Sequence, residues 1–236
     1  MITAFGDSIV KGVLLQSNPD GTHEYGVSNE SIVDLCGRKL GISTLNYARF
    51  ACTAPLGERM VERYESRLNP EQIVLIGYGG NDSDYNWSAI AAHPEEEHHP
   101  RTNLTEYVNA YTHMIQRVRS AGAIPVLLSM PPMDGEKYFQ FFSKYWTEEE
   151  KENVLKWLGG STTHITTSHE LYNITTWKIA QEQHVPMIDI TTDFLNRRDY
   201  PTYLCEDGVH PNKKGQERIA DLIVEQLHEY DLPLAG

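Results

Sequence analysis

Residues at three separate places in the chain could together carry out nucleophilic acyl transfer. Ser8 follows Gly6-Asp7 near the start, while Asp207 and His210 stand three positions apart near residue 210. A serine hydroxyl attacks a carbonyl carbon when a base takes its proton, and a carboxylate can orient that base. We therefore expect Ser8 as nucleophile, His210 as base and Asp207 as the group that fixes the tautomer of His210.

Asn81 completes this set of residues. It follows Gly79-Gly80 after an apolar run, and its side-chain amide could donate a hydrogen bond to a developing oxyanion, an interaction typically worth about 2.7–4 kcal/mol of barrier. Each residue also has a purely structural interpretation. Ser8 could cap a helix, Asn81 and Asp207 could form turns, and His210 could be a surface histidine.

The elements that must position these residues alternate between strands and helices. Strands are predicted at 2–5, 45–46, 73–76, 124–128 and 185–190. Apolar residues at helical spacing predict helices at 29–39 and 104–121, and further helices are expected at 56–68, which is polar, and at 213–230. Gly122 is expected to end the third helix and Asn212 to cap the last. This alternation predicts an α/β fold in which helices cover both faces of a parallel sheet. Ser8, Asn81 and the Asp207–His210 segment would then all lie at the carboxyl edge of the strands, where such folds bind ligands.

Two segments are longer than such a fold needs, and we expect both to be insertions in a single domain that spans residues 1–236. Residues 83–103 are predicted to be a loop, and their run Glu95-Glu96-Glu97-His98-His99 is expected to be solvated rather than metal-binding. Residues 133–167 are rich in aromatic side chains. These could cap the site, form the buried face of a helical hairpin, or make a dimer contact.

The motifs make the chain resemble the SGNH hydrolases, also called GDSL esterases/lipases. Three blocks match in order: residues 6–12, residues 80–82, and Asp207-Gly208-Val209-His210-Pro211-Asn212. The resemblance implies a three-layer α/β/α, flavodoxin-like sandwich around a mostly parallel five-stranded sheet. It also implies no cofactor and no metal.

In this family a backbone N–H of a glycine, five residues after an asparagine, is a second oxyanion donor. Here that asparagine is Asn46, and Ala51 takes the glycine position. Alanine keeps the N–H, but it would be strained by about 1–2 kcal/mol if the position required a positive φ. The resemblance thus implies an oxyanion hole made by Asn81 and by the N–H groups of Ala51 and Ser8.

We expect a serine esterase that forms an acyl-enzyme on Ser8 and acts on small-acyl esters, such as acetylated carbohydrates. The family also contains lipases, lysophospholipases and thioesterases, and fold alone does not choose among them. Two other classes remain as alternatives. One is a non-catalytic binding module on the same fold, and the other is a phosphate or nucleotide binder that uses Gly6-Asp7-Ser8 as an anion-binding turn.

Net charge, the length of apolar runs and the cysteines indicate which partners and which cellular location to expect. The formal net charge of −13 disfavours binding to nucleic acid or to anionic membranes, so the expected partner is a small ester, and a homo-oligomer stays open. No apolar run is long enough to cross a bilayer, and no signal-peptide pattern is evident. The three widely spaced cysteines read as free thiols. We therefore expect a cytoplasmic protein.

Overall fold

The computed structural model describes residues 1–18 and 22–232. Its core is a sheet of five parallel strands in the order β4-β1-β5-β6-β7. The strands are β1 Ile2–Gly6, β4 Thr44–Asn46, β5 Ile73–Gly77, β6 Ile124–Leu128 and β7 Met187–Ile188. All five predicted strands are present, although β7 is shorter than the predicted 185–190.

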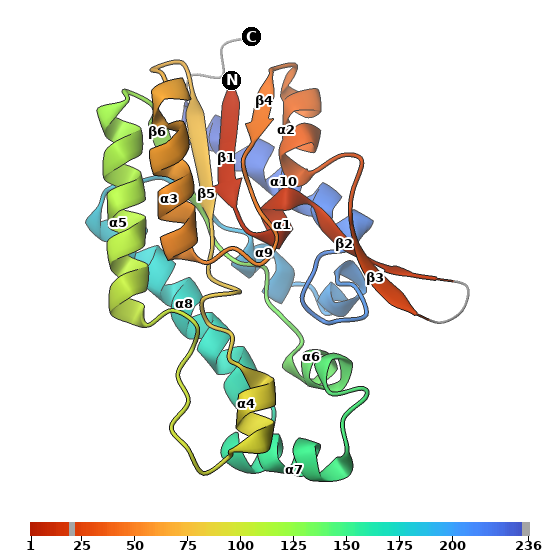
Figure 1. Cartoon of the computed structure of the whole chain (residues 1–236). Coiled ribbons are helices and arrows are strands. Elements are labelled where there is room, and N and C mark those ends of the chain that lie inside the picture. The colour runs from red at the N-terminus through yellow and green to blue at the C-terminus, as the bar shows by residue number, and fades with distance from the viewer. Residues whose placement is uncertain (19–21, 233–236) are drawn as a thin grey trace.

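Helices cover both faces of the sheet and make the three layers predicted from the sequence (Figure 1). One face packs on α3 Ala54–Tyr64, α5 Leu104–Ser120 and α8 Thr163–Glu182, and the other on α2 Ile32–Leu40 and α10 Lys213–Glu229. The side chains of β5 contribute to the apolar clusters on both faces of the sheet. Val74 and Ile76 pack toward α3 and α5, whereas Ile73 and Leu75 pack toward α2 and α10. A continuous apolar run is what a strand buried on both faces requires.

The helix ends follow local signals in the sequence. Asn212 caps α10 by accepting a hydrogen bond from the Gly215 N–H, as predicted. Ser31 and Asp34 form a capping box that starts α2 at Ile32, three residues later than predicted. Gly122 follows α5 at φ +79°, a left-handed conformation that a glycine adopts without strain.

A small antiparallel hairpin, β2 Val13–Ser17 and β3 His23–Val27, follows the short helix α1 Ser8–Lys11. This hairpin is not among the elements predicted from the sequence. It projects from the sheet beside the edge that carries the predicted site residues (Figure 1). The remaining short elements are α9 Thr191–Leu195 and two 3₁₀ helices at Glu65–Arg67 and Tyr200–Tyr203.

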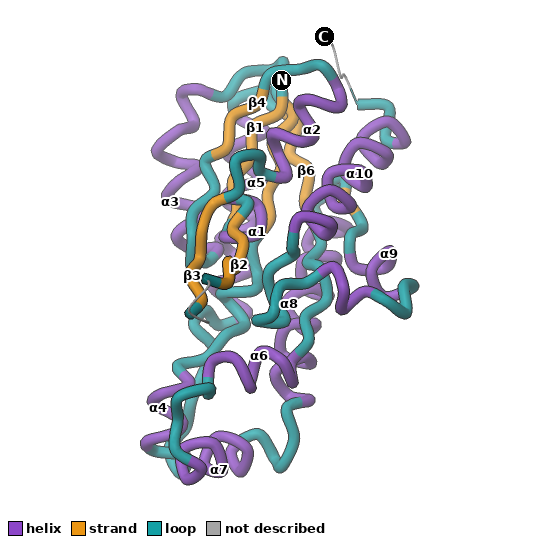
Figure 2. Tube along the Cα trace, turned by 90° about the vertical axis from the view of Figure 1, so that its right-hand side faces the viewer, coloured by secondary structure: helices purple, strands orange, loops and turns teal. Residues whose placement is uncertain are grey.

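The two long segments gather beyond one end of the sheet (Figures 1 and 2). The prediction that residues 83–103 form only a loop is wrong, because they contain α4 Trp87–Ala92. This helix is too short to show periodicity, and it forms because Trp87, Ile90 and Ala91 are buried in a third apolar cluster. Residues 133–167 supply α6 Gly135–Phe142, α7 Glu148–Trp157 and the start of α8.

Most aromatic side chains of the second insertion face this third cluster rather than solvent. Phe139 is buried in it, and Tyr138, Phe142, Trp146 and Trp157 pack against it. Of the alternatives raised for these aromatics, the buried face of an inserted helical unit describes most of them. Two are exceptions: Tyr145 is 85% exposed, and Phe141 packs against His23 and Tyr25 of the hairpin.

Candidate active site

The turn that carries Ser8 is built by close packing between β1 and β5. Gly6 pairs with Gly77, and a Cβ on Gly6 would lie only 2.5 Å from the Cβ of Val10 and 2.8 Å from the Gly77 carbonyl oxygen. Only glycine fits there. Asp7 then caps α1 by accepting a hydrogen bond from the Ile9 N–H at 2.9 Å. Ser8 thus becomes the first residue of α1, at the carboxyl end of β1.

A tight loop before α10 presents Asp207 and His210. The Cys205 N–H donates to the His210 carbonyl oxygen at 2.7 Å, and the Gly208 N–H donates to the Cys205 carbonyl oxygen at 3.0 Å. Gly208 has φ +71° and touches the start of α6, where a Cβ would lie 2.7 Å from the Asp134 carbonyl oxygen. The loop therefore requires a glycine between the two proposed functional side chains.

Ser8, His210 and Asp207 form one chain of hydrogen bonds. The distance from His210 Nε2 to Ser8 Oγ is 2.8 Å, and that from His210 Nδ1 to Asp207 Oδ2 is 2.7 Å. Asp207 Oδ1 accepts from the N–H groups of Val209 and His210 at 2.9 and 3.0 Å. Burial opposes ionisation of Asp207, but these donors outweigh it and hold the pKa of Asp207 below its ordinary value. The predicted turn role and the predicted orienting role of Asp207 are thus compatible.

Ala51 lies on the loop after β4, and the structure gives it φ +52°. The strain anticipated for an alanine at this position is therefore present. Asn46 anchors the start of the loop, because its side chain donates to the Val10 carbonyl oxygen at 3.0 Å and accepts from the Ala48 N–H at 2.9 Å. The Arg49 N–H donates to the Gly6 carbonyl oxygen at 2.9 Å, which ties this loop to the Ser8 turn.

Asn81 lies on the turn after β5, where Gly79 has φ +141°. Its neighbour Asp82 is fully buried, and Asp82 Oδ1 accepts from the Ala54 N–H at 2.9 Å. The Asn81 turn is thereby joined to the segment that leads from Ala51 into α3.

Two carboxyls behind the site share an unusual environment. Burial is the main reason that the pKa of Asp7 rises to about 6 and that of Asp82 to about 7, and the charge of Asp7 adds to the rise at Asp82. Both groups carry structural hydrogen bonds from backbone N–H groups, so we assign them to the support of the two turns.

One pocket of about 220 Å³ joins all of the predicted site residues except the buried Asp207. Ser8, Ala51, Asn81 and His210 line it at the carboxyl edge of the sheet, and the insertions supply much of the remaining wall. That wall contains Tyr85, Trp87, Arg101, Met133, Tyr138 and Ile165. The pocket is thus lined mainly by apolar and aromatic side chains, with polar groups at a few points, as is typical of small-molecule sites.

Several polar residues of this pocket were not singled out from the sequence, namely Tyr25, Ser83, Asp84, Arg101 and His169. Asp84 accepts hydrogen bonds from Trp87 Nε1 at 2.8 Å and from the Tyr138 hydroxyl at 3.1 Å, and it pairs with Arg101 at 3.1 Å. His169 comes from α8, and Tyr25 comes from the hairpin strand β3. Asp84 follows the Asn81 block directly, which was a usable signal. Tyr25 and His169 lie in segments to which no element had been assigned.

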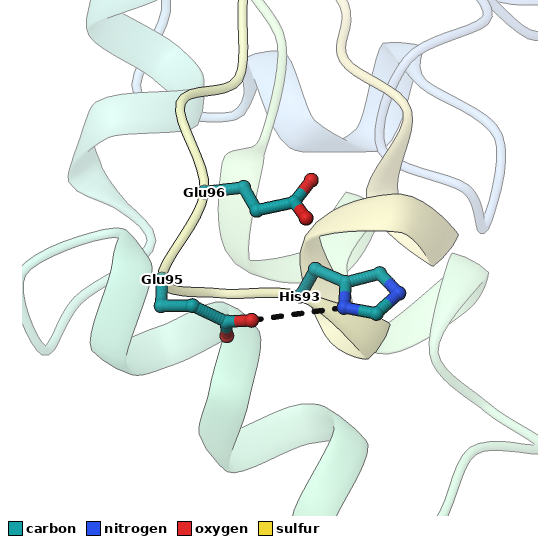
Figure 3. Close-up of side chains that lie close together, drawn as sticks. All are labelled: His93, Glu95 and Glu96. Carbon is teal, nitrogen blue, oxygen red and sulfur yellow. Dashed lines mark ion pairs between the residues drawn. The ribbon is translucent and has the colours of Figure 1, made fainter.

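The histidine and glutamate run on the first insertion lies outside this pocket. His93, Glu95 and Glu96 bring potential ligand atoms within 4.8 Å of one another, and His93 Nδ1 is 3.7 Å from Glu95 Oε1 (Figure 3). All three side chains are exposed. Exposure on a turn after α4 agrees with the predicted solvated loop.

Comparison with known proteins places the chain in a family. The sequence model of the GDSL-like lipase/acylhydrolase family matches residues 4–218. The GDSL esterase/lipase CPRD49 of Arabidopsis thaliana is 26% identical over 159 residues, which are 66% of this chain and 54% of the relative. The chain therefore spans about half the length of that relative.

Solved structures agree on the fold. The lipase/acylhydrolase from Enterococcus faecalis superposes with a TM-score of 0.60 at 17% identity, covering 97% of this chain and 95% of that one. The psychrotrophic esterase EstA from Pseudoalteromonas sp. gives a TM-score of 0.56 at 16% identity, with 97% of each chain covered. Because the family model matches residues 4–218, which are most of the chain, the chain belongs to the GDSL-like lipase/acylhydrolase family.

Proposed function

We propose that this member of a lipase and acylhydrolase family is a serine esterase that forms an acyl-enzyme on Ser8. The observation that carries the proposal is the continuous hydrogen-bond chain from Ser8 Oγ through His210 to Asp207, opening on a small-molecule pocket. The binding-module alternative gives no role to this chain. The anion-binding alternative leaves Asp207 and His210 unexplained.

In the proposed reaction, Ser8 Oγ attacks the carbonyl carbon of the ester while His210 Nε2 takes the hydroxyl proton. Negative charge develops on the carbonyl oxygen, where the Asn81 amide and the N–H groups of Ala51 and Ser8 would donate to it. His210 returns the proton to the leaving alcohol as the C–O bond breaks. Water, deprotonated by His210, then attacks the acyl-enzyme, and the acid leaves as Ser8 regains its proton.

We propose further that the substrate carries a small acyl group, as an acetylated carbohydrate does. The pocket volume of about 220 Å³ supports this, because it lies below the roughly 300–1,000 Å³ typical of small-molecule pockets. Tyr85, Trp87 and Tyr138 line the pocket with aromatic side chains, and Asp84, Arg101 and His169 line it with polar ones. Aromatic faces beside hydrogen-bonding groups suit a sugar hydroxyl and ring better than a long alkyl chain. A lipase or lysophospholipase of the same family is the alternative.

A chain-length series of nitrophenyl esters, extended by acetylated sugars, tests this choice. We expect kcat/KM to be highest for acetyl esters and to fall as the acyl chain grows, because the pocket volume is only about 220 Å³. Ser8→Ala should abolish hydrolysis without unfolding the protein, and Ser66→Ala, at an exposed serine, should change nothing. A preference for long acyl chains would favour the lipase alternative, and full activity in Ser8→Ala would remove Ser8 from the scheme.

The cysteines support the proposed cytoplasmic location. Cys36, Cys52 and Cys205 are all free and buried, and burial raises the pKa of the Cys205 thiol to about 11, which keeps it unreactive. Among the described residues, no helix is both long and apolar enough to cross a membrane. Fractionation of cells that express the full chain tests the location.

A further inference from the structure

Asp207 accepts a hydrogen bond from a donor that belongs neither to its own loop nor to the proposed reaction. Its Oδ1 accepts two backbone N–H groups, and its Oδ2 accepts from His210 Nδ1. The Tyr25 hydroxyl donates to the same Oδ2 at 3.1 Å across 182 residues of sequence. A carboxylate offers about four lone-pair positions. Tyr25, which is 42% exposed, takes the last of these positions on Asp207, which is fully buried.

The hairpin holds Tyr25 against the imidazole of His210. The two ring centroids are 5.1 Å apart, and the Tyr25 ring also lies 5.5 Å from that of Phe50 and 6.4 Å from that of Phe141. Phe50 precedes Ala51, and Phe141 belongs to α6. Tyr25 therefore contacts side chains from the loop after β4, from the second insertion and from the loop that carries His210.

The Tyr25 hydroxyl is a hydrogen-bond donor to Asp207. Burial, followed by the charge of Asp207, raises its pKa above the ordinary value. The hydroxyl thus stays protonated and acts as a donor to Asp207. It competes with His210 Nδ1 for the negative charge on Oδ2, so it reduces the stabilisation that this charge gives to a protonated imidazole.

We propose that Tyr25 is a positioning residue that holds Asp207 Oδ2 in place and limits how strongly Asp207 favours the protonated form of His210. This inference rests on the proposed esterase function of the same site. Its consequence is that a hydrogen bond from the hairpin β2–β3 should affect the pH profile of hydrolysis.

Several other ionisable groups face this network. Asp7 acts electrostatically on His210, and His169 acts on Asp7. Cys205 lies close to both Tyr25 and Asp207, and Glu206 pairs with His23 of the hairpin at 3.0 Å. A substitution that removes only the Tyr25 hydroxyl leaves all of these groups in place, so a change in the pH profile can be assigned to the lost hydrogen bond.

Tyr25→Phe removes that hydroxyl and keeps the ring. We expect the acid limb of the kcat/KM profile to move to higher pH by about 0.5–1 unit, because Oδ2 then acts on the imidazole alone. The plateau rate should fall no more than about tenfold, through looser positioning of Asp207. Tyr145→Phe, at an exposed tyrosine of the second insertion, is the matched control and should leave the profile unchanged. An acid limb that stays in place in Tyr25→Phe, whatever the plateau does, would overturn the proposal.

A second readout does not depend on turnover. The proton between His210 Nδ1 and Asp207 should give a low-field proton NMR signal at low pH, and Tyr25→Phe should raise the pH at which that signal titrates. An unchanged titration would also overturn the inference. If Ser8→Ala abolishes hydrolysis but Tyr25→Phe changes neither the acid limb nor the NMR titration, the esterase proposal is supported and the role proposed for Tyr25 is wrong. If the wild-type chain hydrolyses no ester, the esterase proposal fails, and the role proposed for Tyr25 in catalysis fails with it.

Discussion

Single residues at this site combine structural and proposed chemical roles. Asp207 closes its own turn through Oδ1 and orients His210 through Oδ2. Asp7 caps the helix whose first residue is Ser8. Each carboxylate fixes its own turn locally, and the packing of Gly6 on Gly77 and of Gly208 on Asp134 adds the long-range contacts that place Ser8 and His210. Ala51 differs from these residues, because its left-handed backbone conformation is strained for a residue with a Cβ atom.

Ala51→Gly should relieve this backbone strain. The left-handed φ of +52° costs an alanine about 1–2 kcal/mol, while glycine loses about 0.5–1 kcal/mol more chain entropy on folding. We expect a net gain in the free energy of unfolding of up to about 1 kcal/mol. Activity should stay within about twofold, because the N–H remains. Urea denaturation and ester hydrolysis measure the two effects.

Ala92→Gly is the matched control, since Ala92 is exposed and helical in α4. It should lose stability rather than gain it. A loss of stability in Ala51→Gly as large as that in Ala92→Gly would show that the position is not strained in solution.

At the scale of elements, a hydrogen-bond network around the half-buried Asp84 helps to hold the second insertion to the site. Asp84 follows β5, Trp87 begins α4 and Tyr138 belongs to α6, and hydrogen bonds to Asp84 join the three. Burial raises the pKa of Asp84, although Arg101 and its two donors oppose the rise. An unpaired carboxylate at this depth would be costly, so the network specifies where α6 sits.

Tyr138→Phe should loosen α6. Loss of the hydroxyl leaves a lone-pair position of Asp84 unused, and we expect a loss of about 1–2 kcal/mol in the free energy of unfolding. Limited proteolysis within residues 133–167 should become faster. In Tyr145→Phe, which alters a side chain that is 85% exposed, neither quantity should change. Equal protease resistance of the two variants would contradict the anchoring role of Asp84.

The elements that the sequence predicted are those with a strong apolar pattern. The strands β1, β5, β6 and β7 and the helices α2 and α5 have it, and β1 and β5 lead into Ser8 and Asn81. α8 lacks it, because several of its buried positions are polar, among them Ser168, His169, Asn173 and Thr176. The buried residues of α8 recur at helical spacing, but because many of them are polar, the pattern of apolar residues does not reveal the helix.

The hairpin could have been predicted. The residues Asn18-Pro19-Asp20-Gly21 form a turn-like sequence between two strand-length runs, although residues 19–21 lie outside the described structure. Tyr25 could not have been assigned to the site on that basis. Its contact with Asp207 joins two segments 182 residues apart, and no local pattern records such a pairing.

At the scale of the whole molecule, folding brings the two ends of the sequence together at one edge of the sheet. Ser8 and His210 are 202 residues apart in sequence and share a hydrogen bond of 2.8 Å. The central strands also bury Asp7 and Asp82 behind this edge, so the stability of the whole fold should depend on their protonation.

Asp82→Asn tests this dependence. The folded-state pKa of Asp82 is about 7, above the ordinary value of 3.8, so the folded chain holds a proton that the unfolded chain releases between about pH 4 and pH 7. Stability contributed by that proton is present below this window and is lost as the pH rises through it. The amide oxygen of asparagine can still accept from the Ala54 N–H. We expect the loss of unfolding free energy between pH 5 and pH 8 to shrink by about 2 kcal/mol.

Denaturation of both forms at the two pH values measures the change. Asp199→Asn, at an exposed carboxyl, controls for the removal of one charge and should keep the wild-type pH dependence. An Asp82→Asn protein with that same dependence would show that Asp82 does not hold a proton in the folded state.

The central claim is that the Ser8 hydroxyl is the nucleophile activated by His210, and covalent labelling tests it most directly. A fluorophosphonate probe should add to the native chain, and peptide mass mapping should find the adduct on Ser8. The adduct should be absent from Ser8→Ala and form much more slowly in His210→Ala. An adduct on another residue, or no adduct in a preparation that hydrolyses esters, would contradict the account.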